Sequence, residues 1–357
     1  MSLLEHEVPA TPVYRARIDH PSAWRVADFK SQADYTLELD AANLRDLDES
    51  LRRIKAAGLG LDDLGPEHFE WPSWSPLIAA IKQQIEEGRG FILLRRLPVE
   101  DYSKDEIGMI VWGIGTRLGH GQSQSVLGDR LGHVRDFSRE DPHARAYRNK
   151  QELSPHTDLS DLVGLACLRD AKAGGVSRLT SAVTLHNLLL EECPELLERL
   201  YRGYVWHRRG EEQPGDLPHT PWLVPVYSQQ DGKVSVRYVR SYVDAGEAAV
   251  GRPMDAAERA VLDRFEELSK RPEVMLEFTL RPGEMYLINN YTILHARTAF
   301  EDWEEEDGRR HLLRLWLEAP WMRRVHPHVH LFAGGGIAAV AGKTPSFDWS
   351  RLTGRQP

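Results

Sequence analysis

The sequence predicts a mixed α and β fold, mainly β at its centre, in which packed sheets are supported by helices. Three observations predict it. Short apolar runs typical of buried strands, such as residues 162–168, fill the middle and end of the 357-residue chain. Apolar residues at helical spacing dominate its first third. Helical segments also stand between the later strands, where they would cover the sheets from outside.

The first third is predicted to be helix-rich with one early strand. Residues 1 to about 37 show no periodic pattern and are expected to wrap the surface. Ser75-Pro76 indicates a helix start, because proline fits the first helical turn, and residues 103–106 have the form of a capping box. The predicted elements are helices at about 40–57, 75–88 and 103–117, and a buried strand at 90–94.

The remainder is predicted to be strand-rich. Gly174-Gly175 marks a turn, and Asp231-Gly232 is a strong hairpin signal because these residue types tolerate positive φ. Pro194 is expected to interrupt a helix. The predicted strands are 162–168, 177–181, 226–228, 234–239, 274–280, 285–289 and 312–317, and the predicted helices are 183–202 and 255–270.

Composition excludes several classes of protein. The net charge of -9 and the isoelectric point near 5.9 argue against nucleic acid as a partner. No apolar run approaches the ~18 residues of a membrane helix, and the first residues lack the basic start and apolar stretch of a signal peptide. Cys167 lies in an apolar run and is expected to be a buried thiol. We therefore expect a cytoplasmic enzyme that acts on a small molecule, with no nucleic-acid or membrane partner. Homo-oligomerisation stays open.

The tripeptide His156-Thr157-Asp158 is the strongest chemical signal. An imidazole and a carboxylate two positions apart point the same way on an extended segment. Together they would supply two thirds of a two-histidine, one-carboxylate iron site. His295, which follows another predicted strand, is the candidate for the third ligand. Each residue also has an ordinary interpretation: His156 as a loop hydrogen-bonding group, Asp158 as a turn residue and His295 as a core histidine.

These residues, together with a Gly-Gly turn followed by Thr180 and with Arg310 beyond His295, resemble a known family. It is the TauD/TfdA group of iron(II)/2-oxoglutarate-dependent dioxygenases, within the clavaminate-synthase-like superfamily. The resemblance covers roughly residues 90–320. It implies a double-stranded β-helix, a jelly roll of two facing sheets with the iron at its open mouth. The chain would then be one domain, 1–357, in which residues 1–88 form a helix-rich extension packed on the core.

The resemblance also implies roles for single residues. His156, Asp158 and His295 would be the catalytic metal ligands. The Thr180 hydroxyl and the Arg310 guanidinium would bind the distal carboxylate of 2-oxoglutarate. Arg314 matches a second arginine that contacts substrate in some relatives. The acidic segment 301–307 lengthens the gap before Arg310, and Arg310 and Arg314 would share a strand face, so alternation does not separate their roles.

The expected chemistry follows from this set. Iron(II), 2-oxoglutarate and dioxygen would react to give succinate, carbon dioxide and an oxidant that abstracts hydrogen from a C–H bond. The Asp158 carboxylate favours hydroxylation, since halogenating relatives replace it with a small residue. Arg240 and Arg314 would suit a small anionic or carboxylate-bearing substrate, and Tyr147, Trp206, His207 and Tyr242 lie in segments that could reach it.

Two other functions stay open at this stage. A zinc-dependent hydrolase could use the same three ligands to activate water. A jelly-roll binding protein without turnover could keep the fold. The hydrolase would not require Thr180 and Arg310, which favours the dioxygenase. Arg310 and Arg314 could form salt bridges with the acids of 301–307 rather than bind a ligand. The histidines of 326–330 are expected to pack or to lie on the surface. The glycosylation sequon at Asn290 is discounted because it lies where a strand is expected.

Overall fold

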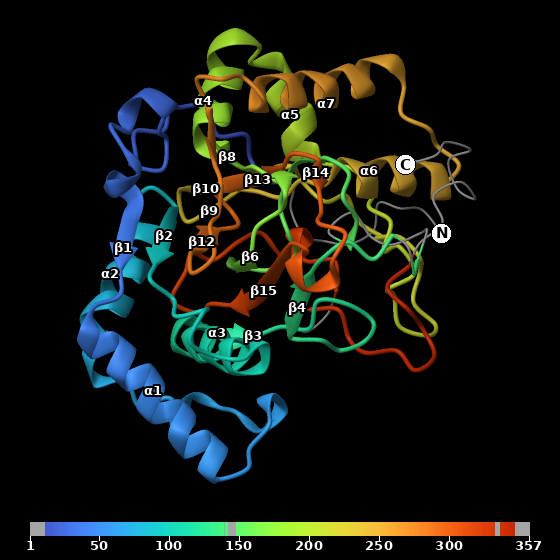
Figure 1. Cartoon of the computed structure of the whole chain (residues 1–357). Coiled ribbons are helices and arrows are strands. Elements are labelled where there is room, and N and C mark those ends of the chain that lie inside the picture. Colours follow the sequence, from blue (N-terminus) through green and yellow to red (C-terminus); the bar gives the residue numbers. More distant parts are fainter. Residues whose placement is uncertain (1–10, 139, 142–147, 333–335, 347–357) are drawn as a thin grey trace.

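Most strands belong to two sheets that enclose a common core (Figure 1). Two further pairs, β9 (Tyr227–Gln230) with β10 (Lys233–Val236) and β7 (Ala173–Gly174) with β14 (Phe300–Glu301), are separate. The computed structural model describes residues 11–138, 140–141, 148–332 and 336–346. In spatial order, the larger sheet contains β1 (Thr36–Glu38), β2 (Phe91–Arg95), β12 (Met285–Asn289), β6 (Leu162–Arg169), β15 (His311–Glu318) and β3 (His120–Gly121), with β4 (Leu131–Val134) also paired to β15. The smaller sheet contains β11 (Met275–Phe278), β8 (Ser177–Ser181), β13 (Ile293–Arg297) and β5 (Leu153–His156).

Side-chain alternation on β15 shows how the sheets pack. Leu312 and Trp316 face the core between the two sheets, whereas Leu313 and Leu315 face the helices outside. A strand covered on both faces has to be apolar throughout, which explains the continuous apolar runs that predicted β6 and β15. The predicted mixed α and β fold with two facing sheets is confirmed, and this arrangement is consistent with a jelly roll.

Three helices cover the outer face of the larger sheet: α1 (Ala41–Ala56), α2 (Ser75–Glu86) and α3 (Lys104–Leu118) (Figure 1). Their predicted starts, at about residues 40, 75 and 103, are confirmed. At the start of α3, the Ser103 hydroxyl accepts from the Glu106 backbone N–H at 3.3 Å and closes a capping box. α3 lies directly on the sheet. A Cβ at Gly115 would sit 3.0 Å from Leu315 of β15, so glycine allows this close approach.

A second group of helices covers the outer face of the smaller sheet, around Leu294 of β13. Pro194 separates two of them, as predicted, because it stands where the second begins. The group comprises α4 (Ala182–Glu192), α5 (Glu195–Arg202), α6 (Arg240–Ala249) and α7 (Ala256–Ser269), joined by the hairpin of β9 (Tyr227–Gln230) and β10 (Lys233–Val236). The hairpin turn has positive φ at Asp231 and Gly232, which confirms that prediction.

The sequence did not predict α6. Gly246 in its middle lowers the helical signal. The structure needs that glycine, because a Cβ there would collide with the backbone of Val205. Close packing against Val205 therefore requires glycine at this position, although glycine is a poor helix former.

Residues 11–37 differ from the expected surface wrap. Trp24 and Tyr35 are buried in the core between the sheets, and the Trp24 indole donates to the Arg89 carbonyl at 2.9 Å. Residues 11–35 are irregular because these side chains hold them, whereas Thr36 and Leu37 belong to β1 and pair with β2. Residues 1–10 lie outside the described part. None of the helices in the described segments has the length and apolarity needed to cross a membrane.

The packing of α3 on β15 predicts the effect of a core truncation. Leu315→Ala removes a fully buried side chain and leaves a cavity, so we expect the free energy of unfolding to fall by about 2–5 kcal/mol. Urea unfolding would measure the change. Leu127→Ala is the matched control, because Leu127 is 57% exposed and should lose little. Equal losses in the two variants would contradict this account of the core.

Candidate metal centre

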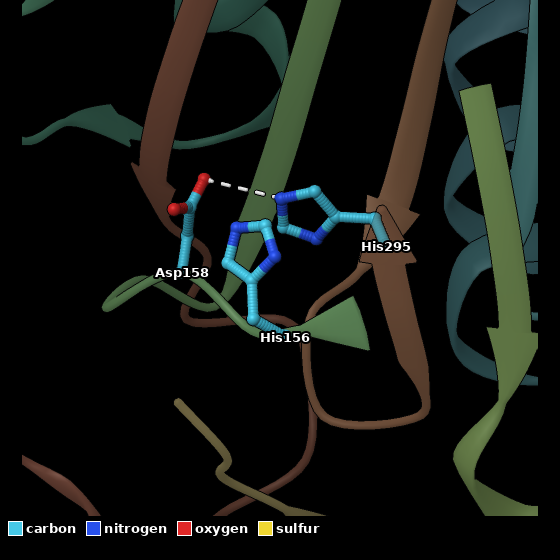
Figure 2. Close-up of side chains that lie close together, drawn as sticks. All are labelled: His156, Asp158 and His295. Carbon is cyan, nitrogen blue, oxygen red and sulfur yellow. Dashed lines mark ion pairs between the residues drawn. The ribbon is translucent and has the colours of Figure 1, made fainter. Parts of the chain in front are cut away.

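Three side chains from two segments far apart in the sequence converge on one point. One ligand atom each from His156, Asp158 and His295 lies within 4.8 Å of the others (Figure 2). No second group of three histidine, cysteine or acidic side chains converges in this way across the described residues. His328, for example, donates its backbone N–H to the ring of His326 and so takes part in a local turn, as expected.

Strand pairing brings the two imidazoles together. β5 pairs antiparallel with β13, and His156 stands directly opposite His295, with ring centroids 4.2 Å apart. Directly opposed residues share a face of the sheet. The Cα partner of His295 on its other side is Leu179, a residue of the core between the sheets. Both imidazoles therefore point into the space that the two sheets enclose.

Asp158 lies just beyond the end of β5, where a side-chain amide holds its backbone. Asn290 accepts from the Asp158 N–H at 3.0 Å and donates to the Asp158 carbonyl at 2.7 Å and to the Ser160 carbonyl at 2.6 Å. Arg237 donates to the same Asp158 carbonyl. These bonds replace the ladder that ends at His156, so Asp158 keeps its orientation outside a strand.

Asn290 is a functional residue that the sequence analysis missed. It was seen only as part of a glycosylation sequon, and its complete burial agrees with discounting that sequon. Its position between two predicted strands gave no sign that it would reach Asp158. Only the three-dimensional structure shows the hydrogen bonds between Asn290 and the Asp158 backbone.

The protonation states suit a divalent metal ion. Burial lowers the pKa of His295 to about 3, and repulsion from His156 adds to the effect. Burial also lowers the pKa of His156. For Asp158 burial acts to raise the pKa, but Arg314, the two histidines and the Trp316 indole outweigh it and bring the pKa to about 2. Near neutral pH the site thus holds two neutral imidazoles and one carboxylate, the forms that bind metals.

The free ligand atoms fit a metal as well. Nδ1 of His156 donates to the Ser154 carbonyl at 2.9 Å, so the neutral ring keeps Nε2 for a metal. Nε2 of His295 is 3.7 Å from Oδ2 of Asp158, which is too long for a hydrogen bond. An ion with bonds of ~2 Å to each atom could bridge that gap.

Arg314 lies against the carboxylate of Asp158 rather than against the acids of 301–307. Its Nη1 is 3.3 Å from Oδ1 of Asp158, and its Nε donates to Oε1 of Gln124 at 2.7 Å. The Trp316 indole donates to Oδ2 of Asp158 at 2.8 Å. Gln124 and Trp316 were not predicted, because nothing in the sequence links them to Asp158.

Arg310 forms a second positively charged part of the same space. Its side chain is buried, and its Nη1 has no hydrogen-bond partner among the described residues. Its guanidinium lies 5.0 Å from the Phe300 ring centre, and that of Arg297 lies 4.7 Å from the same ring. Burial lowers the pKa of Arg310, and burial followed by repulsion from Arg310 lowers the pKa of Arg297 to about 9. A bound anion would relieve this repulsion.

Tyr286 of β12 connects the two parts of the site. Burial raises the pKa of its hydroxyl, and Asp158, Arg310 and Arg314 are among the charges that act on it. The side chain belongs to the core between the sheets. Tyr286 therefore lies within electrostatic reach of both Asp158 and Arg310.

Thr180 lies on the opposite face of β8 from the candidate ligands. Its Cα partner on β13 is Leu294, a residue of the outer helical cluster, and its hydroxyl donates to the carbonyl of Ser269 in α7 at 2.8 Å. Ser177, three residues earlier on β8, is buried and stands opposite Phe278 of the core between the sheets. Ser177 thus shares the inner face, and Thr180 does not.

The expected substrate contacts also change. Arg240 pairs with Asp244 at 3.0 Å and Asp263 at 2.8 Å, so its charge is already compensated on α6 and α7. Trp206 and Tyr242 pack in the helical cluster outside the smaller sheet. Tyr147 lies outside the described residues. Arg240 therefore no longer supports an anionic substrate.

Comparisons with known proteins identify the family. Residues 54–316 match the sequence model of the family described as Taurine catabolism dioxygenase TauD, TfdA family. The FR-33289 synthase of Streptomyces rubellomurinus is 33% identical over 302 residues, which cover 83% of this chain and 88% of that protein. The taurine hydroxylase-like protein SAT17 of Stachybotrys chartarum is 29% identical over 313 residues, 84% of this chain and 79% of that protein.

Solved structures share the fold. An asparagine oxygenase in complex with Fe(II), 2S,3S-3-hydroxyasparagine and succinate superimposes with a TM-score of 0.61 at 16% identity, covering 80% of this chain and 93% of that chain. The non-haem iron oxygenase OrfP in complex with Fe, succinate and (3S)-hydroxy-L-Arg gives a TM-score of 0.59 at 14% identity, covering 81% and 99%. At these identities the match concerns the fold.

The lowered pKa of His295 predicts a pH dependence of stability. Unfolded chains bind a proton at this histidine near pH 6.5, and the folded protein binds it near pH 3, so acidification between these values favours unfolding. We expect the metal-free protein to lose up to about 1.4 kcal/mol per pH unit through His295, and His295→Gln to remove that share. Urea unfolding between about pH 7 and pH 5 measures it, with the exposed His120→Gln as control. If His295→Gln keeps the full acid sensitivity, the assignment is wrong.

Proposed function

The chain belongs to the Taurine catabolism dioxygenase TauD, TfdA family, and on this premise we propose that His156, Asp158 and His295 are the protein ligands of its iron(II). The protein is a dioxygenase that uses iron(II), 2-oxoglutarate and dioxygen. Its reaction couples oxidative decarboxylation of 2-oxoglutarate, which yields succinate and carbon dioxide, to oxidation of a C–H bond in a small molecule. The observation that carries the ligand assignment is the convergence of two neutral imidazoles and one ionised carboxylate.

Arg310 is the proposed partner of the distal carboxylate of 2-oxoglutarate. A buried guanidinium with an unpartnered Nη1, next to a second guanidinium across Phe300, favours an anion at this place. We assign the accompanying hydroxyl to Ser177 instead of Thr180, because Ser177 is on the inner face of β8. Nε of Arg310 lies 3.3 Å from the position of a Cβ at Gly175, which places Arg310 beside the turn that leads to Ser177.

Arg314 has a different proposed role from Arg310. Its guanidinium is directed to the Asp158 carboxylate and to Gln124, so it supports a ligand instead of offering its charge to the distal carboxylate. This division follows from position on the strand: both arginines face inwards, and Arg314 is nearer to the metal ligands.

For the substrate we propose a small molecule that carries a carboxylate. The support comes from the neighbouring structures, which hold hydroxyasparagine and hydroxy-L-arginine, both amino acids. We also propose that residues 1–357 form one domain, and that the protein is cytoplasmic. Both cysteines, Cys167 and Cys193, are buried and unpaired, which supports a reducing compartment. A zinc hydrolase would share the three ligands but has no use for the arginine pair around Phe300.

Iron and cosubstrate binding test the proposal directly. Under anaerobic conditions, addition of iron(II) and 2-oxoglutarate should produce a weak visible charge-transfer band, and admission of air should yield succinate. His156→Ala should abolish the band because it removes one of three ligands. His120→Ala, at an exposed position, is the control and should behave as the wild type. Absence of the band in the wild-type protein would refute the proposed ligand set.

A second prediction separates Arg310 from Thr180. Arg310→Met removes the cation while keeping an apolar stem, and loss of one partner of a buried charge pair costs about 3–5 kcal/mol, or roughly 100-fold or more in affinity. Thr180→Val should leave 2-oxoglutarate affinity unchanged, since its hydroxyl bonds to Ser269. Titration of the charge-transfer band with 2-oxoglutarate measures both.

The opposite pattern would show that the assignment is reversed. If Thr180→Val weakened binding and Arg310→Met did not, the inner face of β8 would be wrongly identified. If Arg314→Met alone destroyed the affinity, the two arginines would have exchanged roles.

A further inference from the structure

Both side chains that donate to the carboxylate of Asp158 come from β15, and Nη1 of Arg314 also lies 3.5 Å from Oδ2. The Trp316 indole donates to Oδ2 at 2.8 Å, and Nη1 of Arg314 lies 3.3 Å from Oδ1. Oδ2 is also the oxygen that stands 3.7 Å from Nε2 of His295 (Figure 2). The oxygen directed at the proposed metal position is therefore the one that Trp316 holds.

The bond from Trp316 differs from those of the other tryptophans. The indoles of Trp24, Trp74 and Trp112 donate to backbone carbonyls, and that of Trp71 donates to the Ser50 hydroxyl. Among the tryptophans that the structure describes, Trp316 is the one whose indole donates to a carboxylate. Buried indoles usually find an acceptor, although Nε1 of Trp206 is buried without a partner among the described residues. Trp316 is thus distinguished by its acceptor, the carboxylate of a proposed metal ligand.

Trp316 is held firmly in place. Its side chain is almost fully buried, and the strand pairs it with Val163 of β6. The Arg314 guanidinium lies over its ring at 4.8 Å. Arg314 is fixed in turn by Gln124, which accepts from Nε at 2.7 Å and donates to the Arg314 carbonyl at 2.8 Å. The two donors to Asp158 therefore form one rigid unit on the larger sheet.

The arrangement restricts how the carboxylate can bind a metal. Each carboxylate oxygen offers about two lone-pair positions. The Trp316 indole occupies one position on Oδ2, and Nη1 of Arg314 lies 3.3 Å from Oδ1 and 3.5 Å from Oδ2. Rotation of the carboxylate to offer both oxygens to one ion would break or strain these contacts. A single oxygen, in a fixed direction, is the arrangement that keeps them.

We propose that Trp316 is a positioning residue for the metal centre: its indole N–H orients Asp158 so that one carboxylate oxygen is presented to the ion. The proposal rests on the proposed function, because it takes Asp158 as a metal ligand. Hydrogen bonds to the groups that ligate a metal commonly change metal affinity 10–100-fold when removed. Trp316 would act through Asp158 without touching the metal itself.

The test compares two tryptophan-to-phenylalanine changes. Trp316→Phe removes the indole donor and keeps an aromatic ring. Trp112→Phe removes an indole bond of the same 2.8 Å length, to the Leu64 carbonyl, from the core outside the larger sheet. Metal-free proteins are titrated anaerobically with Co(II), whose visible absorption reports both affinity and ligand geometry. We expect Trp316→Phe to weaken Co(II) binding about 10–100-fold and to change the spectrum, and Trp112→Phe to leave both unchanged.

The outcomes distinguish this inference from the proposed function. If wild-type protein binds Co(II) no better than His156→Ala does, the ligand set fails and the inference falls with it. If wild-type protein binds and Trp316→Phe matches it in affinity and spectrum, only the inference is overturned. A general loss of stability would weaken Trp316→Phe and Trp112→Phe alike, and equal effects on Co(II) would also overturn the inference.

A measurement on the wild-type protein covers the case in which Trp316→Phe does not fold. The indole N–H resonance of Trp316 is identified as the one that moves in metal-free Asp158→Asn. Because the indole is bonded to an oxygen that would ligate the ion, its resonance should shift on addition of Zn(II), whereas that of Trp112 should not. A Trp316 resonance that ignores Zn(II), in protein that binds the ion, overturns the proposal.

Discussion

The functional site depends on the register between β5 and β13. In that register His156 stands opposite His295, so both imidazoles enter the space between the sheets. Because side chains alternate along a strand, a slip of one residue would turn one imidazole to the outer face, toward the helices. The ladder ends at His156, and from there Asn290 takes over by binding the backbone of Asp158. Register and one buried amide together define where the three candidate ligands meet.

The same alternation separates what the sequence could predict from what it could not. The candidate ligands His156 and Asp158 were predicted from their spacing, although β5 ends at His156 and Asn290 rather than strand alternation orients Asp158. The hydroxyl on β8 was not predictable in this way, because a continuous buried strand offers similar residues to both faces, and only the pairing with β13 shows that Thr180 faces outwards. Apolar periodicity predicted most helices and strands. It did not predict α6, in which Gly246 is required by close packing against the Val205 backbone and lowers the helical signal.

Contacts between remote segments were outside the reach of the sequence. Asn290, Trp316 and Gln124 reach Asp158 or its arginine partner through space, and none belongs to a spacing pattern. Arg310 was identified by resemblance, but its unpartnered Nη1 and its neighbour Arg297 across Phe300 are visible only in the fold. Those features give a physical reason why Arg310 would bind an anion. Among the described residues no carboxylate forms a salt bridge with its buried guanidinium, and a buried cation is costly unless an anion accompanies it.

The two sheets contribute different functions to one space. The smaller sheet and its loop provide the imidazoles, and the larger sheet provides the groups that act on charge, namely Arg314 and Trp316 at Asp158 and Tyr286 further along. Asp158 is therefore held by its backbone from one side and by its carboxylate from the other. A ligand fixed at both ends cannot follow a small shift of either sheet. The relative position of the sheets, which the two helical covers stabilise from outside, thus determines the geometry offered to the metal.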